Sequence, residues 1–182
     1  MRISALILAA VVPAVAPAQQ VMAPPKPDAP RDSASQYYHE MLVGLRDTVN
    51  AVSSRLNDLR RDLLTAGDVT VLAKAGRLAG TCAAARTALR DAMPAVARAQ
   101  RGARLVPARD SLRLAIRALD SGLEQQCVRG LGPAGPGARA DSLRTWGRYR
   151  TAELQHLIIV YHSAVARFAA ALGFKLPTAV SP

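Results

Sequence analysis

The two cysteines, Cys82 and Cys127, are the residues whose type and spacing indicate covalent chemistry most directly. In an oxidising compartment, two cysteines in one domain usually form a disulfide. If the helices that carry them form a hairpin turning near residues 102–106, the two positions fall at the same level. The sequence therefore predicts a Cys82–Cys127 disulfide between the second and third helices. The alternative is a pair of buried free thiols.

Histidines and acids with metal-ligand spacing occur only as fragments of known motifs. His39 and Glu40 begin like the zinc motif H-E-x-x-H, but Val43 stands where the second histidine belongs. Glu153 and His156 form a single E-x-x-H, whereas di-iron helical proteins need two. No metal site is predicted.

Met41 near the start of the first expected helix and His162 near the end of the last would meet at one end of an antiparallel bundle. This arrangement resembles that of small exported four-helix cytochromes. The resemblance implies haem b held by Met41 and His162 as an alternative function. A Soret band that is lost in Met41→Ala and His162→Ala variants would identify it.

Arginine dominates the charge, because the formal net charge of +11 comes from 21 arginines and only three lysines. A candidate anion-binding cluster spans the expected turn and the third helix. Residues 68–129 contain no Phe, Trp or Tyr for base stacking, so an anionic lipid or an acidic partner fits better than nucleic acid. The alternative is a solvated face. The cluster consists of Arg98, Arg101, Arg104, Arg109, Arg113 and Arg117.

A candidate partner surface comes from the last expected helix. Residues 157–161 are apolar around the whole helix, which leaves Ile159 and Val160 outside the inward face. Trp146 and Tyr149 could extend that surface. A partner protein or self-association would cover it, and the alternative cover is the N-terminal segment folded back.

Catalytic motifs are absent from the sequence. It has neither the G-x-S-x-G of a nucleophile elbow nor a phosphate-binding glycine loop, and no pair of acids faces inward on the expected helices. We therefore expect a protein that is not an enzyme.

The N-terminal residues 1–18 have the features of a cleaved secretory signal peptide. Arg2 precedes an apolar run, and small residues at Ala16 and Ala18 precede the expected cleavage point. The apolar run is shorter than a membrane-spanning helix requires. A periplasmic or secreted location follows. Prolines make residues 19–31 a disordered tether.

The remaining chain predicts one domain, residues 32–174, followed by a tail at 175–182. Apolar residues recur at alternating steps of four and three, which is typical of coiled-coil-like seams. We expect helices at about 34–65, 69–101, 107–128 and 141–172, in an all-α, antiparallel, up-down-up-down four-helix bundle. The expected function is that of an exported, non-enzymatic cell-envelope protein that binds a partner protein or an anionic envelope component.

Overall fold

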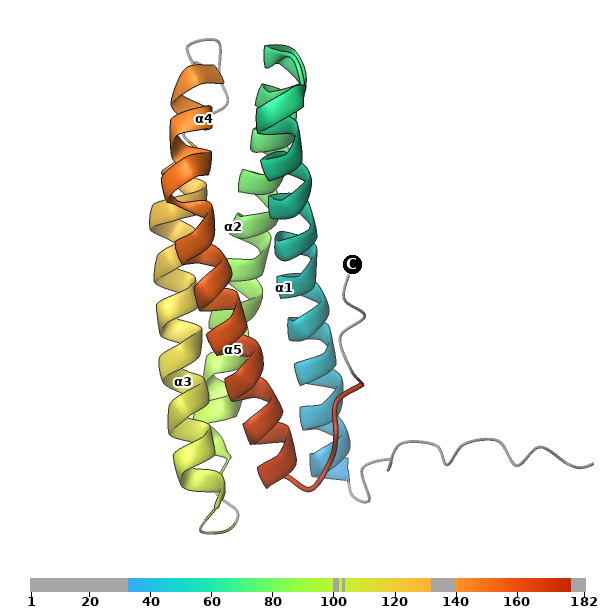
Figure 1. The fold of residues 1–182 in the computed structure, drawn as a ribbon. Helices are drawn as coiled ribbons and strands as arrows, with labels where there is room; N and C mark the ends of the chain where they lie inside the picture. The colour runs from blue at the N-terminus through green and yellow to red at the C-terminus, as the bar shows by residue number, and fades with distance from the viewer. Residues whose placement is uncertain (1–32, 100–101, 103, 132–139, 178–182) are drawn as a thin grey trace, which may run out of the picture.

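Helices and turns make up the part of the chain that the computed structural model describes, residues 33–99, 102, 104–131 and 140–177, and these ranges contain no strand (Figure 1). The all-α prediction is confirmed for them. The predicted signal peptide and tether, residues 1–31, lie outside the described residues. In chain order the elements are α1 (Ser33–Thr65), α2 (Asp68–Arg98), α3 (Leu105–Gly122), the π-helix η1 (Leu123–Val128), α4 (Ala140–Tyr149) and α5 (Thr151–Ala171).

The two longest helices, α1 and α2, each bury one apolar face. Leucine and valine fill this face in α1, whereas alanine and cysteine share it with larger residues in α2. The predicted inward positions are confirmed, since every one is buried except the half-buried Tyr38. The buried residues are Leu42, Leu45, Val49, Val52, Leu56, Leu59 and Leu63 in α1, and Val71, Ala75, Leu78, Cys82, Ala85, Leu89, Ala92 and Val96 in α2.

Proline affects the two helices around the turn in different ways. Pro94 lies inside α2 and does not end it, since the buried apolar positions continue past it to Val96. Helix α3 begins at Leu105, so Pro107 lies in its first turn, where a missing backbone N–H has no helical acceptor to lose. The helical stretch reaches Val128 as expected, but its last turn is a π-helix, in which the Arg129 N–H donates to the carbonyl of Glu124 over 2.9 Å.

The last expected helix, 141–172, is divided at Arg150 into α4 and α5. The hydroxyl of Thr151 donates to the Gly147 carbonyl over 2.8 Å at the division, and the hydroxyls of Thr48 and Thr81 make the same bond inside the unbroken α1 and α2. The apolar face predicted by the four- and three-residue steps continues across the break, since Leu143, Leu154, Tyr161, Ala164 and Phe168 are buried. It is interrupted at the exposed Arg150 and at the half-buried Leu157, beside which Ile158 is buried.

The long elements lie side by side, with the core along their length (Figure 1). Helix α1 packs mainly against α2 and α5, helix α3 packs mainly against α5 and α2, and η1 packs against α2. The segment after α5 turns back along α1, where Phe174 is buried against His39 with 5.3 Å between ring centroids. The predicted tail therefore begins with residues that contact the folded helices, because Leu176 packs against the core and Arg46 donates to the carbonyl of Pro177.

Candidate functional site

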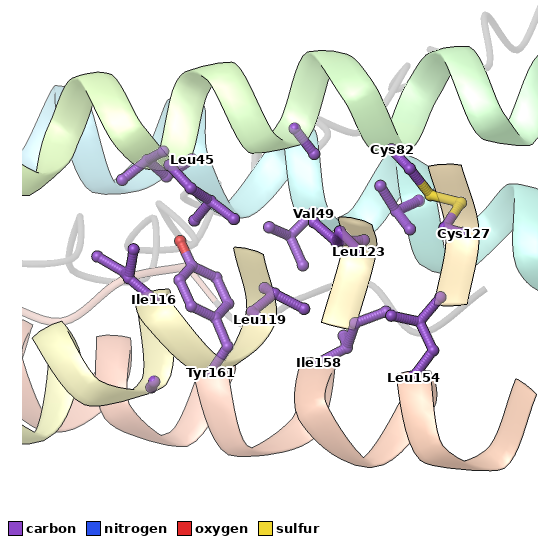
Figure 2. Close-up of a cluster of buried hydrophobic side chains, with 14 of the residues drawn as sticks. Leu45, Val49, Cys82, Ile116, Leu119, Leu123, Cys127, Leu154, Ile158 and Tyr161 are labelled. Atoms are coloured by element: carbon purple, nitrogen blue, oxygen red, sulfur yellow. A yellow bond between two sulfur atoms is a disulfide. The ribbon is translucent and has the colours of Figure 1, made fainter. Parts of the chain in front are cut away.

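The cysteines lie at disulfide-bonding distance, as predicted. The sulfur atoms of Cys82 on α2 and Cys127 on η1 are 2.00 Å apart, and their Cα atoms are 6.3 Å apart (Figure 2). Both side chains are fully buried. A sulfur pair without solvent access is protected from thiols in solution, so this site stabilises the fold and has no geometry for thiol exchange.

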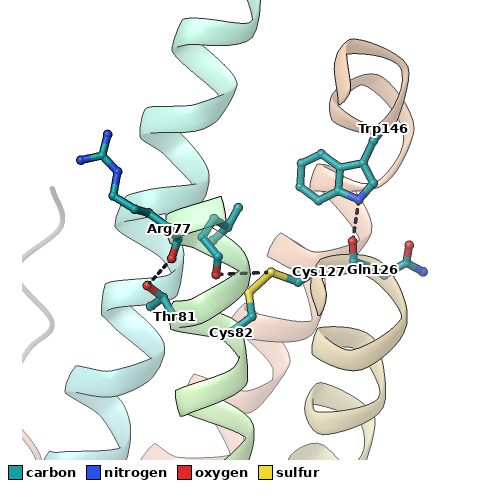
Figure 3. The surroundings of a disulfide bond; sticks show 7 residues. Arg77, Thr81, Cys82, Gln126, Cys127 and Trp146 are labelled. Carbon is teal, nitrogen blue, oxygen red and sulfur yellow. Dashed lines mark hydrogen bonds between the residues drawn. A yellow bond between two sulfur atoms is a disulfide. The ribbon is translucent and has the colours of Figure 1, made fainter. Parts of the chain in front are cut away.

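A polar contact beside the disulfide joins η1 to α4 (Figure 3). The indole Nε1 of Trp146 donates to the backbone carbonyl of Gln126 over 2.5 Å, and the Gln126 side chain donates to Glu153 over 3.0 Å. A Cβ on Gly130 would lie 2.4 Å from the same Gln126 carbonyl and 3.0 Å from the indole nitrogen. Glycine at this position is therefore required for the indole to reach the end of η1.

This burial corrects one part of the predicted partner surface. Trp146 is 7% exposed and belongs to the core, whereas Tyr149, Ile159 and Val160 are 73%, 59% and 38% exposed. The correction has a simple cause: the indole provides a hydrogen-bond donor for a carbonyl at the end of η1, where no further helical turn follows. The exposed apolar surface that remains is formed by the other three residues.

Acidic residues between α2 and α3 are engaged in ion pairs. Arg86 Nε lies 2.9 Å from Asp120 Oδ1, and the same guanidinium pairs with Glu124. Arg90 lies 3.1 Å from Asp120, and Arg129 lies 2.6 Å from Glu124. The sequence does not predict this network, although arginines outnumber acids on these helices and each acid there can therefore find an arginine partner.

The predicted arginine cluster divides into two groups. Arg109 lies 3.0 Å from Asp110 and also donates to the Ala99 carbonyl over 3.3 Å, and Arg113 lies 3.8 Å from the same Asp110. These two arginines are therefore partly neutralised. Arg101 lies outside the described residues. The cluster members left exposed without a protein acid within ion-pair distance, among the described residues, are Arg98, Arg104 and Arg117.

Exposed arginines without a described acidic partner also occur elsewhere on the surface. Every one of them lies on the outer side of a helix whose apolar face is buried. A guanidinium keeps its charge at any physiological pH and binds oxyanions through paired N–H groups. Beyond the predicted cluster this set comprises Arg55, Arg60, Arg61, Arg77, Arg148 and Arg167.

Comparison with known proteins identifies no relative of this chain. It matches no protein-family model, no curated protein and no solved structure. Among the described helices, none combines the length and the apolar character that crossing a membrane requires. The described residues also contain no group of three or more His, Cys, Asp or Glu side chains arranged to hold a metal ion.

The residues proposed for haem, Met41 and His162, lie on α1 and α5. Met41 is half-buried against the core. Burial lowers the pKa of His162, and the positive charge of Arg46 lowers it further. The neutral imidazole, the form that binds iron, is therefore favoured at this position. Haem binding stays a prediction.

Tyr161 places a hydroxyl in the centre of the core without a protein partner among the described residues (Figure 2). Its side chain is fully buried beside Leu45 and Ile116, and desolvation raises the pKa of its phenol strongly. A buried hydroxyl without a hydrogen bond destabilises the folded state relative to the hydrated unfolded chain.

Replacing Tyr161 with phenylalanine is therefore expected to raise the free energy of unfolding by about 1–2 kcal/mol, measured by urea titration. The ring is retained, so the packing of the core does not change. Tyr149→Phe, at an exposed tyrosine of the same chain, is the matched control and should leave stability unchanged. A less stable Tyr161→Phe protein would show that the hydroxyl forms a hydrogen bond in the folded state.

Proposed function

We propose that this protein is an exported, non-enzymatic component of the cell envelope that binds an anionic envelope component through exposed arginines. The observation that carries the proposal is the set of outward-facing arginines with no described acidic partner. Asp110, Asp120 and Glu124 are already paired with other arginines, so the positive charge of Arg98, Arg104 and Arg117 is available to an external anion. The exposed Tyr149, Ile159 and Val160 offer a partner protein or a second copy of the chain as the alternative occupant.

We further propose that the helices form an antiparallel, up-down-up-down four-helix bundle in which α4 and α5 together take the fourth position. The contacts support this arrangement, because α1 packs with α2, α2 with α3, α3 with α5, and α5 with α1. Each position then has two neighbours, as in a closed bundle. In such a bundle the apolar faces point inward and the arginines are directed outward.

Export is supported by two independent features. The sequence of residues 1–18 has the charge, apolar run and small residues of a signal peptide, and the buried Cys82–Cys127 pair is suited to an oxidising compartment. A phosphate-rich anionic membrane surface is then accessible to the mature chain.

The proposal predicts salt-sensitive binding to anionic vesicles. In a co-sedimentation assay, the mature protein should bind phosphatidylglycerol vesicles, should bind phosphatidylcholine vesicles much more weakly, and should be released as salt screens the charges. A variant with Arg98, Arg104 and Arg117 all changed to alanine should lose about tenfold or more in vesicle affinity, since each basic residue near an anionic surface contributes on the order of 1 kcal/mol.

The matched control changes three exposed arginines of α1 instead, namely Arg55, Arg60 and Arg61. It removes the same charge from a different part of the surface and should retain most of the affinity. Absence of binding to phosphatidylglycerol, or binding that salt does not weaken, would contradict the proposed function.

A further inference from the structure

A groove of about 400 Å³ lies between the start of α3 and the end of α5. Arg104 and Ser111 line it from the α3 side, and Arg167 lines it from α5. Proline and alanine side chains form the remaining walls, so nothing bulky occupies the space between the two arginines. The groove exists only where α3 and α5 pack together, and it joins residues that are more than fifty positions apart in sequence.

Both arginines of the groove are exposed, and no acid of the described residues lies within ion-pair distance of either. Asp110 is the first acid after Arg104 in the sequence, and it forms ion pairs with Arg109 and Arg113. The two guanidinium groups therefore keep their N–H donors for an external acceptor. Ser111 adds a hydroxyl donor on the same side.

The N-terminus of α3 beside the groove adds to this preference for an anion, whereas the C-terminus of α5 carries the negative end of its own dipole. The N-terminus of α3 carries the positive end of its helix dipole next to Arg104. The carbonyls at the end of α5 are already hydrogen-bonded, because the N–H groups of Leu172, Gly173 and Phe174 donate back to residues 168–170. Gly173 permits this turn with φ of 88°, a conformation that other residues rarely adopt.

We propose that this groove binds the phosphate headgroup of an anionic lipid, with Arg104 and Arg167 contacting the phosphate oxygens and Ser111 donating a further hydrogen bond. Guanidinium groups bind phosphate through paired N–H donors, and two of them on opposite walls match a phosphodiester between them. The proline and alanine walls suit the first carbons of the lipid better than a fully hydrated ion. This inference rests on the proposed function and assigns its site.

The test compares two double variants that each lose two positive charges from the surface. Arg104→Ala/Arg167→Ala removes the groove arginines, whereas Arg55→Ala/Arg60→Ala removes exposed arginines of α1 that do not line the groove. The groove variant should lose about 10- to 30-fold in affinity for phosphatidylglycerol vesicles, and the control about threefold or less. Thermal unfolding should be alike in both, because all four side chains are exposed.

A second measurement locates the ligand. Amide NMR shifts recorded during titration with short-chain, soluble phosphatidylglycerol should change at Ser111 and Ala170 in the wild-type protein and not in the groove variant. Inorganic phosphate is the parallel arm and should bind at least tenfold more weakly, since it lacks the glycerol and acyl carbons. Equal affinity for inorganic phosphate would overturn the lipid assignment.

The outcomes separate this inference from the proposed function. If the wild-type protein binds vesicles and both double variants lose the same affinity, the groove is not the binding site. The proposed function is then unaffected. Absence of vesicle binding by the wild-type protein, together with NMR shifts at the groove, would overturn the proposed function while showing that the groove binds a soluble phosphate compound.

Discussion

Replacing Cys82 and Cys127 together with alanine is expected to lower the free energy of unfolding by about 4 kcal/mol. The two cysteines are 45 positions apart, and for a loop of that length the chain-entropy model of a disulfide gives roughly this value. Both sulfur atoms are fully buried, so the variant also loses close contacts in the core. A loss of this size is a large fraction of the total free energy of unfolding of a single domain.

Urea unfolding of the oxidised wild-type protein and the double variant measures the difference. Dithiothreitol provides the control, because it should destabilise the wild-type protein once unfolding exposes the disulfide and should leave the double variant unchanged. If the oxidised wild-type protein and the double variant were equally stable, the disulfide would not be formed, or the unfolded chain would already be compact around it.

Trp146→Ala is expected to destabilise the protein by about 3–5 kcal/mol, as is usual when a large buried aromatic side chain is removed. The indole is 7% exposed and also donates to the Gln126 carbonyl, so the variant loses packing and leaves an acceptor of η1 without its partner. The loss should be visible as a lower urea midpoint with an unchanged slope.

Tyr149→Ala is the matched control for this variant. It removes an aromatic residue three positions further along α4 whose side chain is 73% exposed, and it should change stability by no more than about 0.5 kcal/mol. If the two alanine variants were equally stable, Trp146 would be an exposed side chain in solution and would belong to the partner surface that the sequence predicts.

Local periodicity explains why much of the fold is predictable from the sequence. In α1 and α2, the alternating steps of four and three place Leu42 to Leu63 and Val71 to Val96 on single faces, and the structure buries them there. The cysteine pair is predictable for a related reason, because a short turn between two helices fixes which residues lie level with each other.

Features that depend on local backbone geometry or on local hydrogen bonds to backbone carbonyls are not visible in the periodicity of apolar residues. The division at Arg150 is one of them, because buried apolar residues recur on both sides of it and do not mark where the helix is interrupted. The burial of Trp146 depends on a free carbonyl at the end of a π-helix, and π-helices have no sequence signature of their own. Both features lie in the region where the sequence predicts an unbroken helix and an exposed aromatic residue.

The candidate site was predictable only in part, for the same reason. The arginines of the turn and of α3 are close together in sequence, so their clustering is apparent without a structure. Asp110 partly neutralises two of them, which four-residue spacing alone does not reveal. Arg167 joins Arg104 only because α5 packs on α3, a tertiary contact between distant parts of the chain.

The disulfide and the groove together distinguish a part of the protein joined by a covalent cross-link from α5, which is held by noncovalent contacts. The bond ties α2 to η1 at the end of α3, and the chain has no further cysteine with which to tie α5. The groove takes Arg104 from the joined part and Arg167 from α5. A molecule that contacts both arginines therefore adds its binding free energy to the closed arrangement and none to an arrangement in which α5 has separated. The concentration of that molecule then sets how firmly the last helix is held in place.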